Sequence, residues 1–209
     1  KRLNSKMYAE AKRLGVKWIL GGECGHMWRV INQYMDTMNG PADFMEVPVN
    51  PITGTVFENA KSTKMVHITE FTADLIKHGK LDLTPSRNDH LKVTFHDSCN
   101  VARASRMGPR PGGQFTIPRD VIRASCNHFF DMPQDTIHEA TYCCGGGGGL
   151  LTDDLMELRV KGALPRMEAL QHVVEQHGVT HLAAICAICK SQFSKVLPYY
   201  GFTMDSIVS

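Results

Sequence analysis

The spacing of the cysteines constrains this chain more than any other feature of the sequence. Five of the seven follow one order: a single cysteine, an adjacent pair and a C-x-x-C, namely Cys99, Cys143, Cys144, Cys186 and Cys189. The two intervals are 43 and 41 residues long. Thiolates at this density select zinc, copper(I) or an iron–sulfur cluster. Four ligands complete a tetrahedral zinc site, so the fifth thiolate favours iron–sulfur.

The composition is that of an ordinary soluble domain. Of the 209 residues, 43% are hydrophobic and 21% charged, and the formal net charge is +2. Such a balance gives no bulk attraction to nucleic acid. We also expect no direct membrane span, because no apolar run approaches about 20 residues. The sequence starts at Lys1 without an initiator methionine and enters directly on a helical pattern, which favours a segment of a longer protein.

An odd number of cysteines without a signal peptide predicts reduced thiols or metal ligands in a reducing compartment. A disulfide framework is the alternative interpretation. Cys126 has no partner at metal-ligand spacing, and we expect it to be a buried structural thiol.

Strand and helix patterns alternate along the chain, which predicts an α/β fold with parallel strands. We expect a buried strand over residues 16–20 and further strands over residues 91–95 and 180–185. We expect helices ending at Gly15 and over residues 27–38, 67–78, 153–161, 165–176 and 190–197, with a short helix after Pro118. Residues 40–62, 82–89 and 103–119 have the composition of irregular segments.

The chain resembles itself at two places. Residues 11–20 and 174–183 both read as helix, Gly-Val and strand, and each is followed by a cysteine turn and another helix. This repeat predicts two pseudo-symmetric halves, each with a small, mainly parallel sheet and crossover helices. We place a degenerate first cysteine-rich half, which the sequence enters partway through, at residues 1–87. The cysteine-rich domain that binds the cluster is placed at residues 88–209. The cluster site should lie at the carboxyl ends of the strands.

Five glycines, residues 145–149, directly follow the cysteine pair. Gly145 and Gly146 are the candidates for cofactor contact, because backbone without side chains lets N–H groups approach cluster sulfurs. A flexible turn is the simpler interpretation of the run. A phosphate loop is excluded, because no Gly-Lys-Ser/Thr follows.

The pattern C…C-C-G…C-x-x-C resembles the cysteine-rich "CCG" domain of the heterodisulfide reductase family. Two further phrases, Gly-Glu-Cys24-Gly-His26 and Phe95-His96-Asp97-Ser98-Cys99, are most similar to DsrK-type subunits of the DsrMKJOP complex of dissimilatory sulfur metabolism. The intervals of 43 and 41 residues are longer than usual in the family. The first half also lacks a cysteine pair and a C-x-x-C, so we expect no complete second cluster there.

This resemblance implies a noncubane [4Fe-4S] cluster whose ligands are Cys99, Cys143, Cys144, Cys186 and Cys189. It also implies an enzyme subunit that reduces or forms a disulfide or trisulfide on a small DsrC-like sulfur-carrier protein. Electrons would be exchanged with the quinone pool through a membrane cytochrome subunit of the same complex. The implied location is cytoplasmic, with peripheral attachment to the inner membrane through partner subunits.

Cys24 and His26 are the candidate catalytic pair, on a glycine-flanked turn at the start of a helix. A helix N-terminus favours a thiolate, and an imidazole can hold or relay a proton. A vestigial buried thiol with a hydrogen-bonded imidazole is the alternative. His96 either tunes the cluster or bonds a backbone carbonyl.

Five arginines form a local basic region that could receive an acidic or carboxylate-ended partner, or simply be a solvated loop: Arg103, Arg106, Arg110, Arg119 and Arg123. Two other functions compete with the disulfide enzyme. One is an electron-transfer iron–sulfur subunit of a flavin 2-hydroxy-acid (glycolate or lactate) oxidase, and the other is a structural zinc module.

Overall fold

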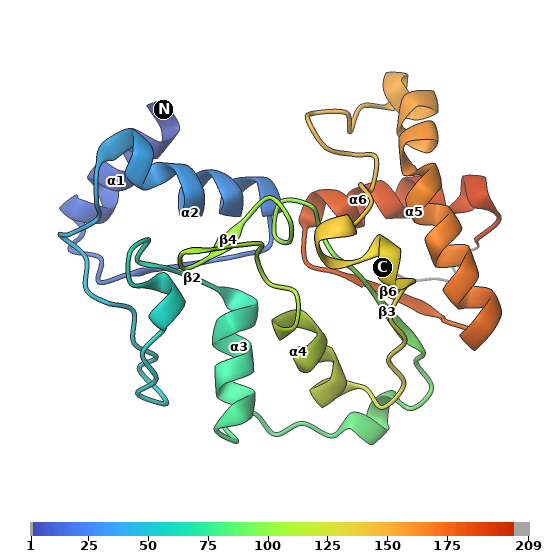
Figure 1. The fold of residues 1–209 in the computed structure, drawn as a ribbon, viewed down its shortest axis with the longest axis horizontal. Helices are drawn as coiled ribbons and strands as arrows, with labels where there is room; N and C mark the ends of the chain where they lie inside the picture. Colours follow the sequence, from blue (N-terminus) through green and yellow to red (C-terminus); the bar gives the residue numbers. More distant parts are fainter. Residues whose placement is uncertain (1, 203–209) are drawn as a thin grey trace.

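The computed structural model describes residues 2–202 and contains two small parallel sheets flanked by helices (Figure 1). In the first sheet, β1 (Ile19–Gly21) pairs with β2 (Met65–His67). In the second, β3 (Val93–His96) pairs with β6 (His181–Ala184), with Val93 opposite His181 and His96 opposite Ala184. The predicted α/β class with parallel strands is therefore confirmed.

Helices α1 (Arg2–Arg13), α2 (Gly25–Asn39) and α3 (Ile68–Lys77) accompany the first sheet. Helix α1 ends as predicted: Gly15 has a positive φ of 61°, and the N–H of Val16 bonds the carbonyl of Ala11 at 3.0 Å. Helix α2 packs against α1, and α3 packs against α4 (Ile117–Ser125), which follows the short antiparallel hairpin of β4 (Arg106–Met107) and β5 (Arg110–Pro111). In Figure 1, α3 and α4 lie side by side between the two sheets.

Helices α5 (Met156–His177) and α6 (Ala187–Val196) accompany the second sheet. The prediction of two helices over residues 153–161 and 165–176 is wrong, because α5 runs unbroken through Pro165. Proline removes a hydrogen bond inside a helix. Here Ala163 and Met167, on either side of it, are buried at 0% and 1% exposure, and this packing favours one helix. Helix α5 ends at Gly178, in the left-handed conformation, as predicted.

The described part of the chain also contains six short 3₁₀ helices: Glu58–Ala60, Pro85–Asn88, Gln134–Thr136, His138–Ala140, Asp153–Leu155 and Leu197–Tyr200. The main hydrophobic core lies between α5, α6 and the second sheet, and includes Leu170, Leu182 and Phe193. A smaller core around Trp28, Ile31 and Met65 joins α2 to the first sheet.

Two details differ from the sequence predictions. The strand expected over residues 16–20 is shorter and half-exposed, with Leu20 at 46% exposure, whereas a buried strand was predicted. Strand β2 was not predicted at all. The two similar segments do form the same order of elements, α1–β1–α2 and α5–β6–α6. Pseudo-symmetry in space, and the division into residues 1–87 and 88–209, stay predictions.

Candidate functional site: a cluster of five thiols

The second sheet brings two of the cysteine segments to one edge. Because β3 and β6 are parallel, both strands end at the same side. Cys99 follows β3 by three residues, and Cys186 is the residue that precedes the first turn of α6, with Cys189 inside that turn. The pair Cys143–Cys144 enters from the loop between Ala140 and Asp153.

All five thiols meet in one unbroken series of contacts. Hydrogen bonds join Cys99 to Cys143, Cys143 to Cys144, Cys144 to Cys189 and Cys189 to Cys186. None of the seven cysteines of the chain forms a disulfide. Cys144, Cys186 and Cys189 are buried, whereas Cys99 and Cys143 are half-exposed. The accessible edge of this thiol cluster is therefore the Cys99–Cys143 edge.

The contacts separate the thiols into proton donors and acceptors. Hydrogen bonds from Cys144 and Cys99 lower the pKa of Cys143. A bond from Cys189, helped by backbone N–H groups that include Gly25 at 3.3 Å, lowers the pKa of Cys186 to about 5. The donors respond in the opposite direction: bonding to Cys143 raises the pKa of Cys99, and that of Cys144 rises to about 12. The site therefore stabilises thiolates at two separate positions.

The glycine run packs tightly at its start and is open at its end. The N–H of Gly145 bonds the Cys143 sulfur at 3.3 Å, and the N–H of Gly146 bonds Cys144. Gly145 has a φ of +84°, and a Cβ there would lie 2.7 Å from the Arg159 carbonyl oxygen. A Cβ on Gly148 would meet nothing within 4 Å. Glycine is thus required for close packing beside the thiols at Gly145.

His96 is completely buried at the end of β3. Its ring, the Cys144 sulfur and the Cys189 sulfur offer ligand atoms within 4.8 Å of one another. Neither ring nitrogen has a hydrogen-bond partner among the described residues, so the interpretation that His96 bonds a backbone carbonyl is wrong. Burial lowers the pKa of His96 well below its ordinary value. Unpartnered buried polar atoms beside clustered thiols fit a metal or an inorganic cluster at this position.

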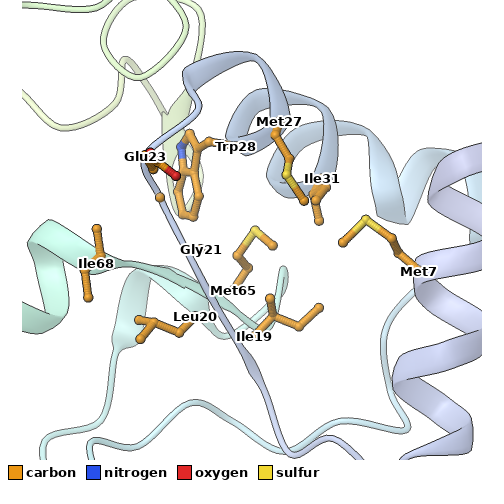
Figure 2. Close-up of a pocket in the computed structure, with 11 residues that line it drawn as sticks. Met7, Ile19, Leu20, Gly21, Glu23, Met27, Trp28, Ile31, Met65 and Ile68 are labelled. Atoms are coloured by element: carbon orange, nitrogen blue, oxygen red, sulfur yellow. The ribbon is translucent and has the colours of Figure 1, made fainter. Parts of the chain in front are cut away.

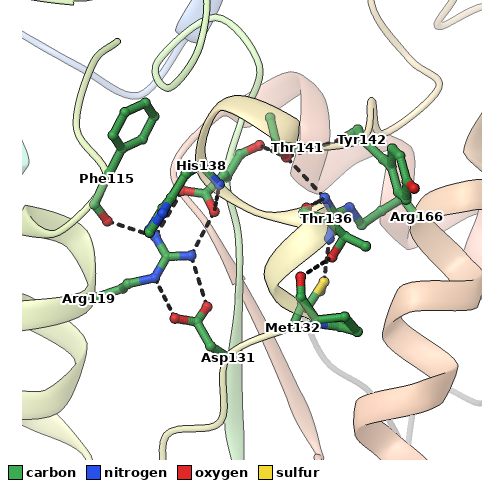
Figure 3. A network of polar contacts seen from close by, with 11 residues as sticks. Phe115, Arg119, Asp131, Met132, Thr136, His138, Thr141, Tyr142 and Arg166 are labelled. Carbon is green, nitrogen blue, oxygen red and sulfur yellow. Dashed lines mark hydrogen bonds and ion pairs between the residues drawn. The ribbon is translucent and has the colours of Figure 1, made fainter.

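A buried polar network behind the cluster was not foreseen from the sequence (Figure 3). Arg119 bonds both carboxylate oxygens of Asp97 and of Asp131, at 2.7–2.9 Å. The Asp97 carboxylate also accepts the N–H of His138 at 3.1 Å, and its carbonyl accepts the Thr141 hydroxyl at 2.7 Å. The network therefore fixes the loop that leads to Cys143. It also removes Arg119 from the basic region predicted over residues 103–123.

Arg166 lies next to this network, completely buried on α5. Its guanidinium donates to the Thr141 hydroxyl at 3.0 Å and to the Thr136 carbonyl, and contacts the Met132 sulfur. Burial lowers its pKa to about 10, against the favourable charges of Asp97, Cys144 and Cys189, so it stays cationic at neutral pH. The sequence does carry a signal: Arg159, Ala163, Arg166 and Leu170 share one helical face, and all are buried.

The Cys24–His26 turn lies against the cysteine loop of α6, as the repeat predicted. Besides the bond from Gly25 to Cys186, the N–H of Ala187 bonds the carbonyl of Glu23 at 2.9 Å. His26 lies beside the glycine run, with its Nε2 atom 3.8 Å from the Cβ position of Gly147. Among the described residues, no hydrogen bond joins the Cys24 sulfur to the five thiols. Cys126 also lies outside the series, at the end of α4, and is half-exposed, so the expectation that it is buried is wrong.

An apolar cavity of 470 Å³ lies beside this turn and is lined in part by Gly21, Gly22 and Glu23 (Figure 2). Met7 from α1, Trp28 from α2 and Met65 from β2 point into it, and the Glu23 carboxylate is at its rim. The residues that line it include none of the cysteines. Among the described residues, no helix is long and apolar enough to cross a bilayer.

Comparison with known proteins gives matches over nearly the whole chain. It is 47% identical over 216 aligned residues to the Hdr-like menaquinol oxidoreductase iron-sulfur subunit of Archaeoglobus profundus. It is 44% identical over 216 to the Hdr-like menaquinol oxidoreductase iron-sulfur subunit 2 of Archaeoglobus fulgidus. Each alignment covers 97% of this chain but 38% of the relative, so the chain spans less than two fifths of their length.

A shorter match reaches the heterodisulfide reductases themselves. Over 107 residues, 48% of this chain and 24% of the relative, the chain is 36% identical to a subunit of the dihydromethanophenazine:CoB–CoM heterodisulfide reductase of Methanosarcina mazei. No protein-family profile matches the chain, and no solved structure does. The matches support an Hdr-like family of iron–sulfur oxidoreductase subunits. They do not single out DsrK-type subunits within it.

Proposed function

We propose that the thiols of Cys99, Cys143, Cys144, Cys186 and Cys189 hold a noncubane [4Fe-4S] cluster, and that the protein reduces or forms a disulfide there. The observation that carries this proposal is the unbroken series of five thiols, one more than a tetrahedral zinc ion needs. The names of the Archaeoglobus relatives, which are iron–sulfur subunits, support it.

The residues around the thiols suit a group with net negative charge. Backbone N–H groups of Gly25, Gly145 and Gly146 donate to sulfur. Such hydrogen bonds to the sulfurs of a cluster are one of the means by which a protein tunes its potential. When bound, the cluster supplies electrons to a sulfur substrate and accepts them from it.

Cleavage of the disulfide R–S–S–R′ consumes two electrons and two protons and yields RSH and R′SH; formation is the reverse. In our proposal His26 holds one of these protons, because it lies beside the glycine run and its Nδ1 atom is buried without a partner among the described residues. Cys24 contacts the substrate sulfur from the neighbouring turn. Both assignments follow from the contact of that turn with the Cys186 loop.

For the complete protein we propose a place in a menaquinol-linked electron-transfer complex, which the Archaeoglobus relatives' names support. The electrons would pass through a membrane cytochrome subunit, and the sulfur substrate would be carried by a small DsrC-like protein. The location proposed is the cytoplasmic face of the membrane, with attachment through these partner subunits.

Electron paramagnetic resonance of the oxidised, anaerobically purified protein tests the proposal. A paramagnetic signal that appears or changes on adding a thiol substrate is the expected result, because the substrate sulfur reaches the redox group. An iron–sulfur signal that does not change when thiols are added would favour a protein that only relays electrons. Zinc without iron or acid-labile sulfide would instead favour the structural module.

The electron relay is the second candidate, and two matches favour it. The chain is 31% identical over 111 residues to the probable iron-sulfur-binding oxidoreductase FadF of Bacillus subtilis. It is 27% identical over 144 residues to EtfAB:quinone oxidoreductase of Syntrophomonas wolfei. In that case the chain would serve a flavin-dependent oxidase, such as a 2-hydroxy-acid oxidase, and would bind no sulfur substrate.

A further inference from the structure

Three arginines line a pocket of 340 Å³ between α2 and the segment of residues 103–111. They are Arg29, Arg103 and Arg106, and the remaining lining residues carry no acidic side chain. Two of the three, Arg103 and Arg106, belong to the basic region visible in the sequence. Arg29 joins them only in the fold, because α2 packs beside this segment.

The charge of this pocket is not neutralised within the described part of the chain. Arg29 bonds the neutral groups of Asn100 and Tyr34, at 3.3 and 3.1 Å, and Arg103 bonds the Thr141 carbonyl at 2.8 Å. The Nε atom of Arg106 is buried without a hydrogen-bond partner among the described residues.

None of these three arginines forms an ion pair among the described residues, whereas Arg119 and Arg123 do. Arg106 does act electrostatically on Asp36, a carboxylate whose pKa is raised by burial. The pocket therefore keeps an excess of positive charge.

Two arginines of the pocket, Arg29 and Arg103, bond the segments that carry the half-exposed thiols. Arg29 bonds Asn100, which directly follows Cys99. Arg103 bonds the carbonyl of Thr141, two residues before Cys143. The charge of Arg103 acts on the Cys99 thiol itself. Cys99 and Cys143 are the two half-exposed members of the cluster. An anionic group in this pocket would thus be held by arginines that also bond the segments of Cys99 and Cys143.

We propose that the pocket of Arg29, Arg103 and Arg106 binds a carboxylate of the sulfur substrate and directs its disulfide to the Cys99–Cys143 edge. Guanidinium groups bind carboxylates through charge-assisted, often bidentate hydrogen bonds. The identity of the reaction rests on the proposed function, but the binding of the carboxylate does not.

Isothermal titration calorimetry on the purified protein tests the binding. The probes are dithiodipropionate, a disulfide with two carboxylates, and hydroxyethyl disulfide, its neutral counterpart. We expect the dianion to bind more tightly, and its affinity to fall with added salt. Arg106→Gln should weaken dianion binding about tenfold, the loss of one charge-assisted bond. This variant gives up no side-chain hydrogen bond of the described structure, so it should fold normally.

Arg123→Gln is the matched control, because Arg123 is paired with Asp120 at 3.6 Å and lies outside the pocket. It should bind the dianion as the wild type does. Equal affinities of the two disulfides, or equal losses in Arg106→Gln and Arg123→Gln, would overturn the inference.

Turnover separates this inference from the proposed function. With dithionite as the reductant, reduction of each disulfide takes two electrons and two protons and yields two thiols. Arg106→Gln should raise KM for dithiodipropionate and leave kcat and the neutral substrate unchanged. If the protein holds no iron–sulfur cluster yet still prefers the dianion, the proposed function fails and the pocket stands. If the cluster is present and the preference is missing, the pocket fails.

Discussion

Substitution of Gly145 by alanine tests whether close packing of the glycine run holds the cysteine pair in place. The added Cβ would lie 2.7 Å from the Arg159 carbonyl oxygen and 2.8 Å from the Ala163 nitrogen, both backbone atoms of α5. It would also sit on a residue with a φ of +84°. A side chain in that conformation costs about 1–2 kcal/mol. Overpacking against the helix adds about 1–3 kcal/mol.

Gly148→Ala provides the matched control. Gly148 also has a positive φ, of +69°, but a Cβ there meets nothing within 4 Å. Gly148→Ala should therefore lower the free energy of unfolding by the cost of a side chain at positive φ alone, about 1–2 kcal/mol. The difference between the two variants therefore isolates the contact with α5.

Urea unfolding of the cluster-free proteins measures both free energies, and iron analysis after reconstitution measures the consequence for the site. We expect Gly145→Ala to lose about 2–5 kcal/mol and most of its iron, because the chain shifts beside Cys143 and Cys144. Gly148→Ala should keep its iron. Equal stability losses, or full iron in Gly145→Ala, would show that the close packing does not position the cysteines.

Three further predictions follow from the site and its surroundings. Arg166→Met should lower the midpoint potential of the bound cluster, because a buried positive charge near Cys144 and Cys189 stabilises the reduced state. Potentiometric titration measures the potential, and Arg166→Lys should keep most of it because it keeps the charge. Equal potentials in the wild type and both variants would refute an electrostatic effect of Arg166 on the cluster. Cys24→Ala should keep most cluster iron but abolish disulfide turnover, whereas Cys143→Ala should lose the cluster. Full activity of Cys24→Ala in the complete protein would show that Cys24 has no role in catalysis. Burial raises the pKa of Glu70 to about 7, so the folded state binds the extra proton and the free energy of unfolding should fall as pH rises from about 4.5 to 7. Glu70→Gln should remove this cost of ionising a buried carboxyl, which is at most about 3 kcal/mol before solvent screening. In urea unfolding, the variant should therefore gain more stability over the wild type at pH 8 than at pH 4. A gain independent of pH would contradict the raised pKa of Glu70.

The cysteine motif and the parallel strands were predictable because each leaves a local signal. The alternating strand pattern of residues 91–95 ends four residues before Cys99, and Gly178 stands where α5 must end. The same patterns predicted that the thiols would meet, because parallel strands carry their following loops to one edge. The position of the Cys24 turn followed from the repeat of Gly-Val, strand and cysteine.

Other features depend on contacts between distant residues. Pro165 signals a helix end, yet burial of Ala163 and Met167 keeps α5 continuous. Strand β2 has only three residues and is defined by its pairing with β1. The basic region of residues 103–123 divides in the fold, because Arg119 turns inward to bond Asp97 and Asp131.

The buried arginines show the same limit. A helical face with Arg159, Ala163, Arg166 and Leu170 can be read from the sequence, but charged side chains on a helix normally face solvent. Their burial depends on partners supplied by other segments, such as Gln192 for Arg159 and Thr141 for Arg166. Those partners become visible only in three dimensions.

Iron and acid-labile sulfide per chain, measured after anaerobic reconstitution, show whether the five thiols hold an iron–sulfur cluster. We expect about four iron and four sulfide per chain in the wild type. Both values should fall strongly on replacing any one of the five thiol residues, Cys99, Cys143, Cys144, Cys186 and Cys189. Replacing Cys126, which lies outside the series of thiols, should leave both values unchanged. One zinc per chain without sulfide, or full iron after loss of one of the five cysteines, would contradict a cluster held by these thiols.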